Sequence, residues 1–156
     1  MIDGPRQQGA AVSKSDLLGQ ARFAVVQLDR VIDTVGRRRA PSAKMAKVLN
    51  DLTKTRRQLE NTLAIKIKPG SNQARKTALH IMKGATANLR VSADALAGTS
   101  LTFGKVGKFV NFGASALTAI RCFSLSGKIC TNPESPHDQD YPYPKTCPQC
   151  GYAVLP

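Results

Sequence analysis

The chain of 156 residues contains no tryptophan, and aromatic residues make up only 5% of it. A core with so few rings must be built from leucine, isoleucine, valine, alanine and methionine, which favours packed helices over a β-sandwich. No stretch reaches the ~18 consecutive apolar residues that a membrane-spanning helix needs, and the first sixteen residues lack the apolar run of a secretory signal. These absences predict a soluble, intracellular protein with an all-α body.

Groups that carry catalysis are also scarce. The chain has ten acidic residues and two histidines, against 23 lysines and arginines. Neither a convergent pair of carboxylates nor a Ser/His/Asp set is visible in the sequence. We therefore expect a non-enzymatic protein. The net charge of +13 favours a polyanionic partner.

Apolar residues recur at intervals of three and four over four segments, which is the pattern of amphipathic helices. The first segment begins with Ser13 or Ser15 as N-cap and ends at Gly36. The second begins near Ser42 and ends before Pro69, the third covers about 72–97, and the fourth about 101–125. Because short turns join these segments, neighbouring helices should be antiparallel. The sequence predicts an antiparallel bundle of about four helices with an irregular C-terminal tail.

Charge and cysteine content divide the chain into a flexible lead over 1–12, a basic helical bundle over 13–121 and a tail over 122–156. Residues 1–121 contain 21 Lys and Arg against 7 Asp and Glu, whereas residues 122–156 contain 2 against 3. All four cysteines lie in the tail, beside a proline-rich stretch that should be extended or irregular. We therefore expect the bundle to carry the charge and the tail to carry the cysteine chemistry.

Two of these cysteines, Cys147 and Cys150, are separated by two residues and followed by Gly151. A tight turn of this length aims both thiolates at one ion, and the segment 147–151 resembles one knuckle of a zinc ribbon. A tetrahedral site needs two more ligands, and the sequence offers three candidates upstream. We expect zinc to be bound by Cys122, Cys130, Cys147 and Cys150. His137 is the alternative to Cys122 as the fourth ligand.

The cysteines leave other interpretations open. A disulfide pair or free thiols would also account for them, because only the expected intracellular location favours metal over disulfides. A redox-active pair is less favoured, since neither a helix start nor a βαβ pattern follows Cys147 to lower its pKa. If Cys122 at the end of the fourth helix is a ligand, the metal should pin the tail to the helical body.

The basic residues are concentrated as well as numerous. Residues 35–90 contain fourteen Lys and Arg against two acids, whereas a surface that only needs solvation normally mixes both signs. Lys76, Lys83 and Arg90 repeat every seventh residue, so they should form a line along the third helix. We expect the following residues to form one broad positive surface for the phosphate backbone of DNA or RNA: Arg37, Arg38, Arg39, Lys47, Lys54, Arg57, Lys66, Lys68, Lys76, Lys83 and Arg90.

This binding should have little sequence specificity, because the chain shows neither a helix-turn-helix nor an RNP-like signature. Two other functions are also consistent with the sequence. Segment 101–125 has a wide apolar face with Lys105 and Lys108 on its other side, as in helices that lie on anionic membranes. The first two helices carry heptad-like apolar positions, which could form the seam of a homo-oligomer or of a complex with an acidic protein.

Arg56 is unusual because helical geometry places it near the apolar stripe of the second helix. Its charged head could reach water at the rim of the stripe, which is the common arrangement. A contact with Asp29 or Asp33 of the first helix is the alternative, and the sequence favours it less.

Overall fold

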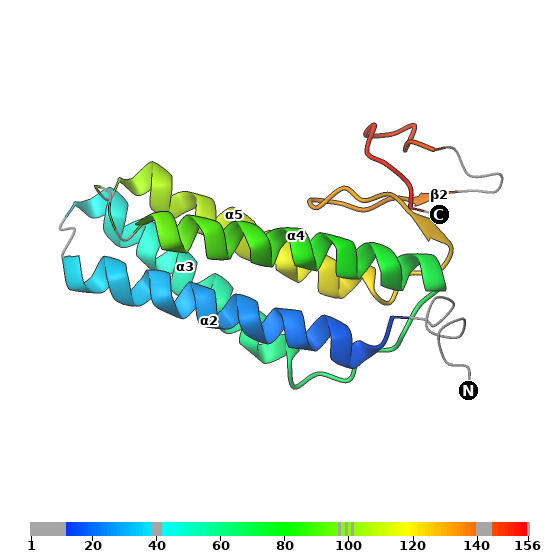
Figure 1. The fold of residues 1–156 in the computed structure, drawn as a ribbon, viewed down its shortest axis with the longest axis horizontal. Coiled ribbons are helices and arrows are strands. Elements are labelled where there is room, and N and C mark those ends of the chain that lie inside the picture. The colour runs from blue at the N-terminus through cyan, green and yellow to red at the C-terminus, as the bar shows by residue number, and fades with distance from the viewer. Residues whose placement is uncertain are drawn as a thin grey trace.

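The computed structural model describes residues 12–38, 42–96, 98, 100, 102–139 and 145–155. Its four helices are α2 (Lys14–Arg38), α3 (Ala43–Thr62), α4 (Asn72–Leu96) and α5 (Phe103–Cys122). They run antiparallel along the chain and form a bundle (Figure 1). The predicted all-α body is therefore confirmed. The expected lead over 1–12 lies outside the described residues except for Val12.

A serine or threonine caps the start of each helix, and Ser13 is one of the two caps that the sequence suggested for α2. The Ser13 hydroxyl accepts a hydrogen bond from the Asp16 N–H at 3.2 Å, and the Asp16 carboxylate accepts one from the Ser13 N–H at 3.0 Å. This reciprocal pair is a capping box with aspartate as the acid. Ser42, Ser71 and Thr102 accept in the same way from N–H groups of the first turns of α3, α4 and α5. These caps determine the residue at which each helix begins.

The helices occupy the four corners of the bundle in the order α2, α4, α5, α3. Helix α2 packs along α3 and α4, and α5 packs along the same two helices. Helices α3 and α4 therefore lie at diagonally opposite corners, and their outward faces point to opposite sides of the bundle. Fully buried side chains from all four helices fill the centre: Leu17, Leu28, Leu52, Leu59, Met82, Leu89 and Phe109.

The apolar face of α5 is part of this core. Val106, Phe109, Ala116 and Ile120 are all buried, because α5 packs between α3 and α4. These residues therefore belong to the core, whereas Phe103 at the start of α5 is exposed, and the membrane-surface alternative stays a prediction. Among the described helices, none combines the length and the apolar character that crossing a bilayer requires.

The tail forms a short two-stranded hairpin over the bundle. Strands β1 (Lys128–Ile129) and β2 (Asp138–Gln139) are antiparallel, with Lys128 opposite Gln139 and Ile129 opposite Asp138. Ile129 is fully buried against the bundle, and its carbonyl accepts a hydrogen bond from the Thr77 hydroxyl of α4 at 3.3 Å. In Figure 1 the tail lies along one end of α4. The described part of the tail is extended or irregular, as expected, and it contacts α4 through Ile129 and Thr77.

The start of the tail is also tied to the turn between α3 and α4. The Gly70 N–H donates to the Phe123 carbonyl at 2.8 Å, and the Ser71 N–H donates to the Leu125 carbonyl at 2.9 Å. The Ser71 hydroxyl donates to the Gly127 carbonyl. Phe123 itself is fully buried. These contacts position the chain so that β1 begins directly above α4.

Candidate metal centre and basic surfaces

The structure brings together Cys130, His137, Cys147 and Cys150, whose ligand atoms all lie within 4.8 Å of one another. The Cys130 Sγ lies 3.7 Å from the Cys150 Sγ and 3.6 Å from the His137 Nδ1. The Cys147 Sγ lies 3.7 Å from the same nitrogen. All four cysteines have free thiols in the structure. The four donors form a compact Cys3His cluster.

The hairpin positions one half of this cluster. Cys130 follows β1 directly and His137 precedes β2 directly, so the two residues face each other across the hairpin. The Cys130 N–H donates to the His137 carbonyl at 3.0 Å, and the His137 N–H donates to the Cys130 Sγ at 3.0 Å. The loop between them thus brings the His137 imidazole close to the Cys130 thiol.

The predicted knuckle forms the other half. The Gly151 N–H donates to the Cys147 carbonyl at 2.8 Å, and Gly151 adopts a φ of 80°, a left-handed conformation that favours glycine. The next residues pair with the hairpin, because the Thr131 N–H donates to the Ala153 carbonyl at 2.9 Å. This pairing brings the knuckle against Cys130.

Three of the six separations between the ligand atoms are those of a tetrahedral ion. Zinc has bonds of ~2.3 Å to sulfur and ~2.0–2.1 Å to imidazole nitrogen, which places tetrahedral ligand atoms roughly 3.5–3.8 Å apart. The three separations given above, 3.7, 3.6 and 3.7 Å, lie in this range. Three soft sulfur donors and one imidazole are also a typical zinc ligand set. The Cys3His cluster could therefore bind a metal ion such as zinc.

Hydrogen bonds support ionised sulfur in this cluster. The buried amide of Gln139 donates to the Cys147 Sγ at 3.2 Å. Desolvation opposes ionisation of Cys147, but hydrogen bonds from the backbone N–H groups of Gln149 and Cys150 and from neighbouring thiols outweigh it and lower the pKa to about 6. Desolvation dominates at Cys130 and raises its pKa. Thiolate is the form of cysteine that binds metal.

Cys122 lies outside the cluster, so the ligand set expected from the sequence is corrected at this position. Its side chain is 1% exposed, and its thiol contacts the Ala74 carbonyl of α4 at 3.6 Å. Burial raises the pKa of Cys122 to about 12, which keeps the thiol protonated. His137, the alternative candidate, takes the fourth place. The last turn of α5 directs the Cys122 side chain into the core, against the Ala74 carbonyl of α4.

The basic residues named from the sequence are exposed wherever their side chains are described: Arg37, Lys47, Lys54, Arg57, Lys66, Lys68, Lys76, Lys83 and Arg90. Arg38 ends α2, and Arg39 lies outside the described residues. The expectation of one broad surface is not met. Lys47 and Lys54 project from α3, whereas Lys76 and Lys83 project from α4 at the opposite corner. The positive charge is thus distributed around the bundle.

The basic groups differ in how far acids neutralise them. Arg37 pairs with Asp33 at 3.1 Å, and Lys47 pairs with Asp51 at 3.8 Å. Lys76, Lys83 and Arg90 form no ion pair within the described parts of the chain. We call these three residues the α4 stripe. It is a row of exposed cations along a single helix.

Comparison of the chain with models of protein families, with curated proteins and with solved structures gives no match. Its fold and site define it as a four-helix antiparallel bundle with a short C-terminal two-strand region that holds a Cys3His cluster.

Proposed function

We propose that the protein is a non-enzymatic nucleic-acid-binding protein that contacts phosphate groups through the α4 stripe, and that zinc in the Cys3His cluster fixes its tail. The observation that carries the proposal is the row of Lys76, Lys83 and Arg90, which are exposed and form no ion pair with any described residue. Seven residues are nearly two helical turns, so the three cations stay in line along α4.

Charge balance supports this choice of surface. Most acids near the stripe already engage other groups. Asp29 of α2 and Glu60 of α3 contact Arg56, and Asp94 of α4 itself contacts Arg30. Asp16 of α2 acts on Lys83 without forming an ion pair with it. The cations of the α4 stripe therefore remain available to phosphate. Each phosphate contact releases condensed counterions, so binding weakens as salt is added. For duplex DNA the logarithm of the binding constant falls by roughly 0.9 per phosphate contact for each unit increase in the logarithm of the salt concentration.

Zinc is proposed as the resident metal because protein donors would fill all four positions of a tetrahedral ion. Such closed sites are structural, whereas catalytic zinc sites keep one position open for water. The ion would join the hairpin residues Cys130 and His137 to the knuckle residues Cys147 and Cys150, which are distant in sequence. Its binding free energy would thus stabilise the folded tail.

Fluorescence anisotropy with labelled DNA and RNA oligonucleotides, at two salt concentrations, tests the nucleic-acid proposal. The test variant is Lys76→Glu/Lys83→Glu/Arg90→Glu, which reverses the stripe. The matched control is Lys47→Glu/Lys54→Glu/Arg57→Glu on α3, which changes the net charge by the same amount at the opposite corner.

We expect the α4 variant to lose most of its affinity and its dependence on salt, and the α3 variant to lose less. Circular dichroism of both variants shows whether the helices are retained. Equal loss in the two variants would mean that only net charge matters and would remove the stripe from the proposal. If the wild-type protein does not bind at low salt, the cations serve another partner, such as an acidic protein.

A further inference from the structure

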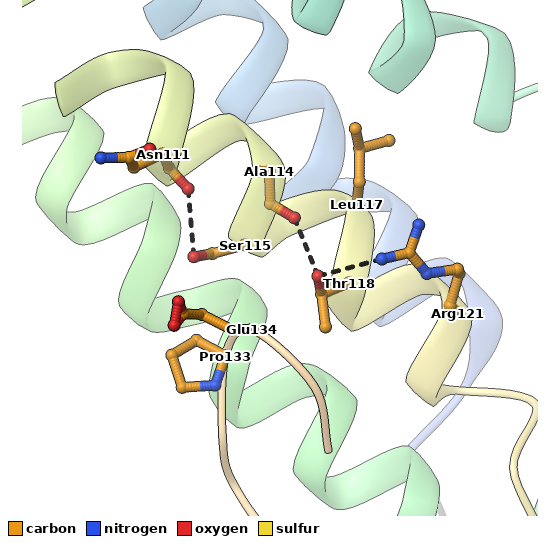
Figure 2. Close-up of a pocket in the computed structure, with 8 residues that line it drawn as sticks. All are labelled: Asn111, Ala114, Ser115, Leu117, Thr118, Arg121, Pro133 and Glu134. Carbon is orange, nitrogen blue, oxygen red and sulfur yellow. Dashed lines mark hydrogen bonds between the residues drawn. The ribbon is translucent and has the colours of Figure 1, made fainter. Parts of the chain in front are cut away.

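Two adjoining cavities lie between the tail and the exposed side of α4 and α5. Their volumes are about 470 Å³ and 410 Å³, and both are lined by Asn111, Ser115 and Pro133. Figure 2 shows the tail loop with Pro133 and Glu134 passing beside α5 at the larger cavity. The shared lining makes the two cavities one groove. Its walls come from the helical bundle on one side and the tail on the other.

The smaller cavity combines aromatic rings with amide groups. Tyr152 of the tail and Phe112 of α5 line it, together with His80 and Asn88 of α4. The Tyr152 side chain is 43% exposed, although an aromatic ring of this size is usually more deeply buried in a protein core. Rings offer a stacking surface to a nucleobase, and side-chain amides offer both donors and acceptors to its edge. The cavity therefore suits a planar, polar heterocycle.

The larger cavity carries charge of both signs. The Arg121 guanidinium donates one hydrogen bond to the Thr118 hydroxyl at 3.3 Å, and its remaining N–H groups are available to a ligand. Glu134 lies on the opposite wall. Its carboxylate would repel a phosphate placed here, but it could accept a hydrogen bond from the amino group of a base. The phosphates of a bound strand should therefore lie outside this cavity.

Lys76 of the α4 stripe supplies a place for a phosphate at the edge of the groove. His80, Gly84 and Asn88 follow one another at four-residue intervals and line the smaller cavity from α4. Lys76 lies one turn before His80 and therefore shares the face of α4 that borders the groove. Lys83 lies about 100° around the helix from Gly84 and acts on Asp16 of α2, so it faces away from the groove. A phosphate on Lys76 could place the attached base in the smaller cavity.

We infer that this groove binds unpaired nucleotides of a single strand, with a base against Tyr152 and Phe112 and a phosphate on Lys76. The inference rests on the proposed nucleic-acid function and makes it specific to single strands. Bases in a duplex are paired and stacked inside the helix, so they cannot enter a cavity without being flipped out. Single-strand binding proteins combine aromatic platforms with a positive groove in this way.

Gly84 allows a direct test of the groove. A Cβ at this position would have no non-neighbouring atom within 4 Å, so a larger side chain can project into the smaller cavity without a clash at its base. Gly84→Leu should block the cavity while improving helix propensity. Gly19→Leu is the matched control, because Gly19 is equally open and lies on the exposed face of α2. Tyr152→Ala removes the stacking ring, and Tyr152→Phe retains it.

The experiment measures the affinity of the full-length, zinc-loaded protein for a labelled single-stranded oligonucleotide and for its duplex, by fluorescence anisotropy. We expect Gly84→Leu and Tyr152→Ala to weaken single-strand binding by about tenfold or more and to leave duplex binding unchanged. Gly19→Leu and Tyr152→Phe should bind both substrates like the wild type. Thermal unfolding monitored by circular dichroism confirms that each variant is folded.

Two results would overturn the inference. One is wild-type affinity for single strands in both Gly84→Leu and Tyr152→Ala. The other is an equal loss for single strand and duplex, which would reflect damage to the whole surface. The proposed function fails differently, since in that case the wild-type protein would bind neither substrate.

Discussion

Gly113 of α5 lies so close to Thr55 of α3 that a Cβ at Gly113 would be 2.5 Å from the Thr55 Cγ2 methyl. Both residues are buried in the contact between these helices. The missing side chain therefore sets how closely α3 and α5 approach. Glycine weakens an isolated helix by about 1 kcal/mol relative to alanine, so tertiary packing must offset that cost here.

We predict that Gly113→Ala lowers the free energy of unfolding by about 1–3 kcal/mol, because the added methyl overpacks the contact. Denaturant unfolding followed by circular dichroism measures the change. Thr55→Ser removes the opposing methyl and should restore part of the loss in the double variant. Gly107→Ala is the control, since a Cβ there would have no non-neighbouring atom within 4 Å. It should be neutral or stabilising. A Gly113→Ala variant that behaves like Gly107→Ala would contradict this account.

Arg56 forms the contact with Asp29 that the sequence left as the less favoured alternative. The Arg56 Nε lies 2.8 Å from the Asp29 Oδ1, and the Arg56 Nη1 lies 2.6 Å from the Glu60 Oε1. The hydrogen bond to Asp29 is the main cause that raises the pKa of Arg56. One guanidinium thus links α2 to α3 and also bridges one turn of α3.

We predict a coupling energy of about 0.5–1 kcal/mol between Arg56 and Asp29, which is typical of ion pairs that remain partly exposed. A double-mutant cycle with Arg56→Ala, Asp29→Ala and the double variant gives this value from denaturant unfolding. The coupling should decrease in 1 M salt, because ions screen exposed pairs. A coupling of zero at low salt would mean that the contact does not stabilise the fold.

The buried thiol of Cys122 should make stability depend on alkaline pH. Burial raises its folded-state pKa from 9.0 to about 12, so the unfolded chain loses this proton first. The stabilisation from the buried, protonated thiol is complete below the pKa of the unfolded chain. It is lost as the pH rises toward the pKa of the folded protein. Between them the free energy of unfolding should fall by up to about 1.4 kcal/mol per pH unit.

Denaturant unfolding of the wild type and of Cys122→Ala from about pH 8 to pH 11 isolates this effect, because the other titrating groups are common to both proteins. We predict that the stability advantage of the wild type shrinks as the pH rises above the unfolded pKa. An advantage that stays constant over this range would show that Cys122 titrates alike in the folded and unfolded chain.

The sequence was sufficient to predict the helices but not how they are arranged around the bundle. Apolar periodicity identifies each helix and the face that it buries, and the candidate caps Ser13 and Ser15 mark the start of the first one. Periodicity does not determine the order of helices around a bundle, since an apolar face can pack against any other. For this reason Lys54 and Lys83 were expected on one surface, whereas α3 and α4 lie at opposite corners.

The metal ligands show a similar division. Spacing alone identified Cys147 and Cys150, because a two-residue gap is a local property of the chain. The choice between Cys122 and His137 depended on where the tail turns back, and the hairpin of β1 and β2 settles it. Helical periodicity nevertheless indicates that Cys122 faces the core. Cys122 follows the buried residues Thr118 and Ala119 by four and three positions, which places its side chain on the core face of α5.

Zinc content separates the ligand set of the structure from the one expected from the sequence. We predict about one zinc ion per chain in the wild type and in Cys122→Ser, because the Cys122 thiol contacts the Ala74 carbonyl and lies outside the cluster. His137→Ala and Cys147→Ser should each lose the ion or bind it much more weakly, since a tetrahedral site then lacks one donor. Metal analysis of zinc-loaded protein after gel filtration measures the stoichiometry. Retention of a full equivalent in His137→Ala together with its loss in a folded Cys122→Ser would reverse the assignment. It would return Cys122 to the site, because only a ligand of the bound ion produces that pattern.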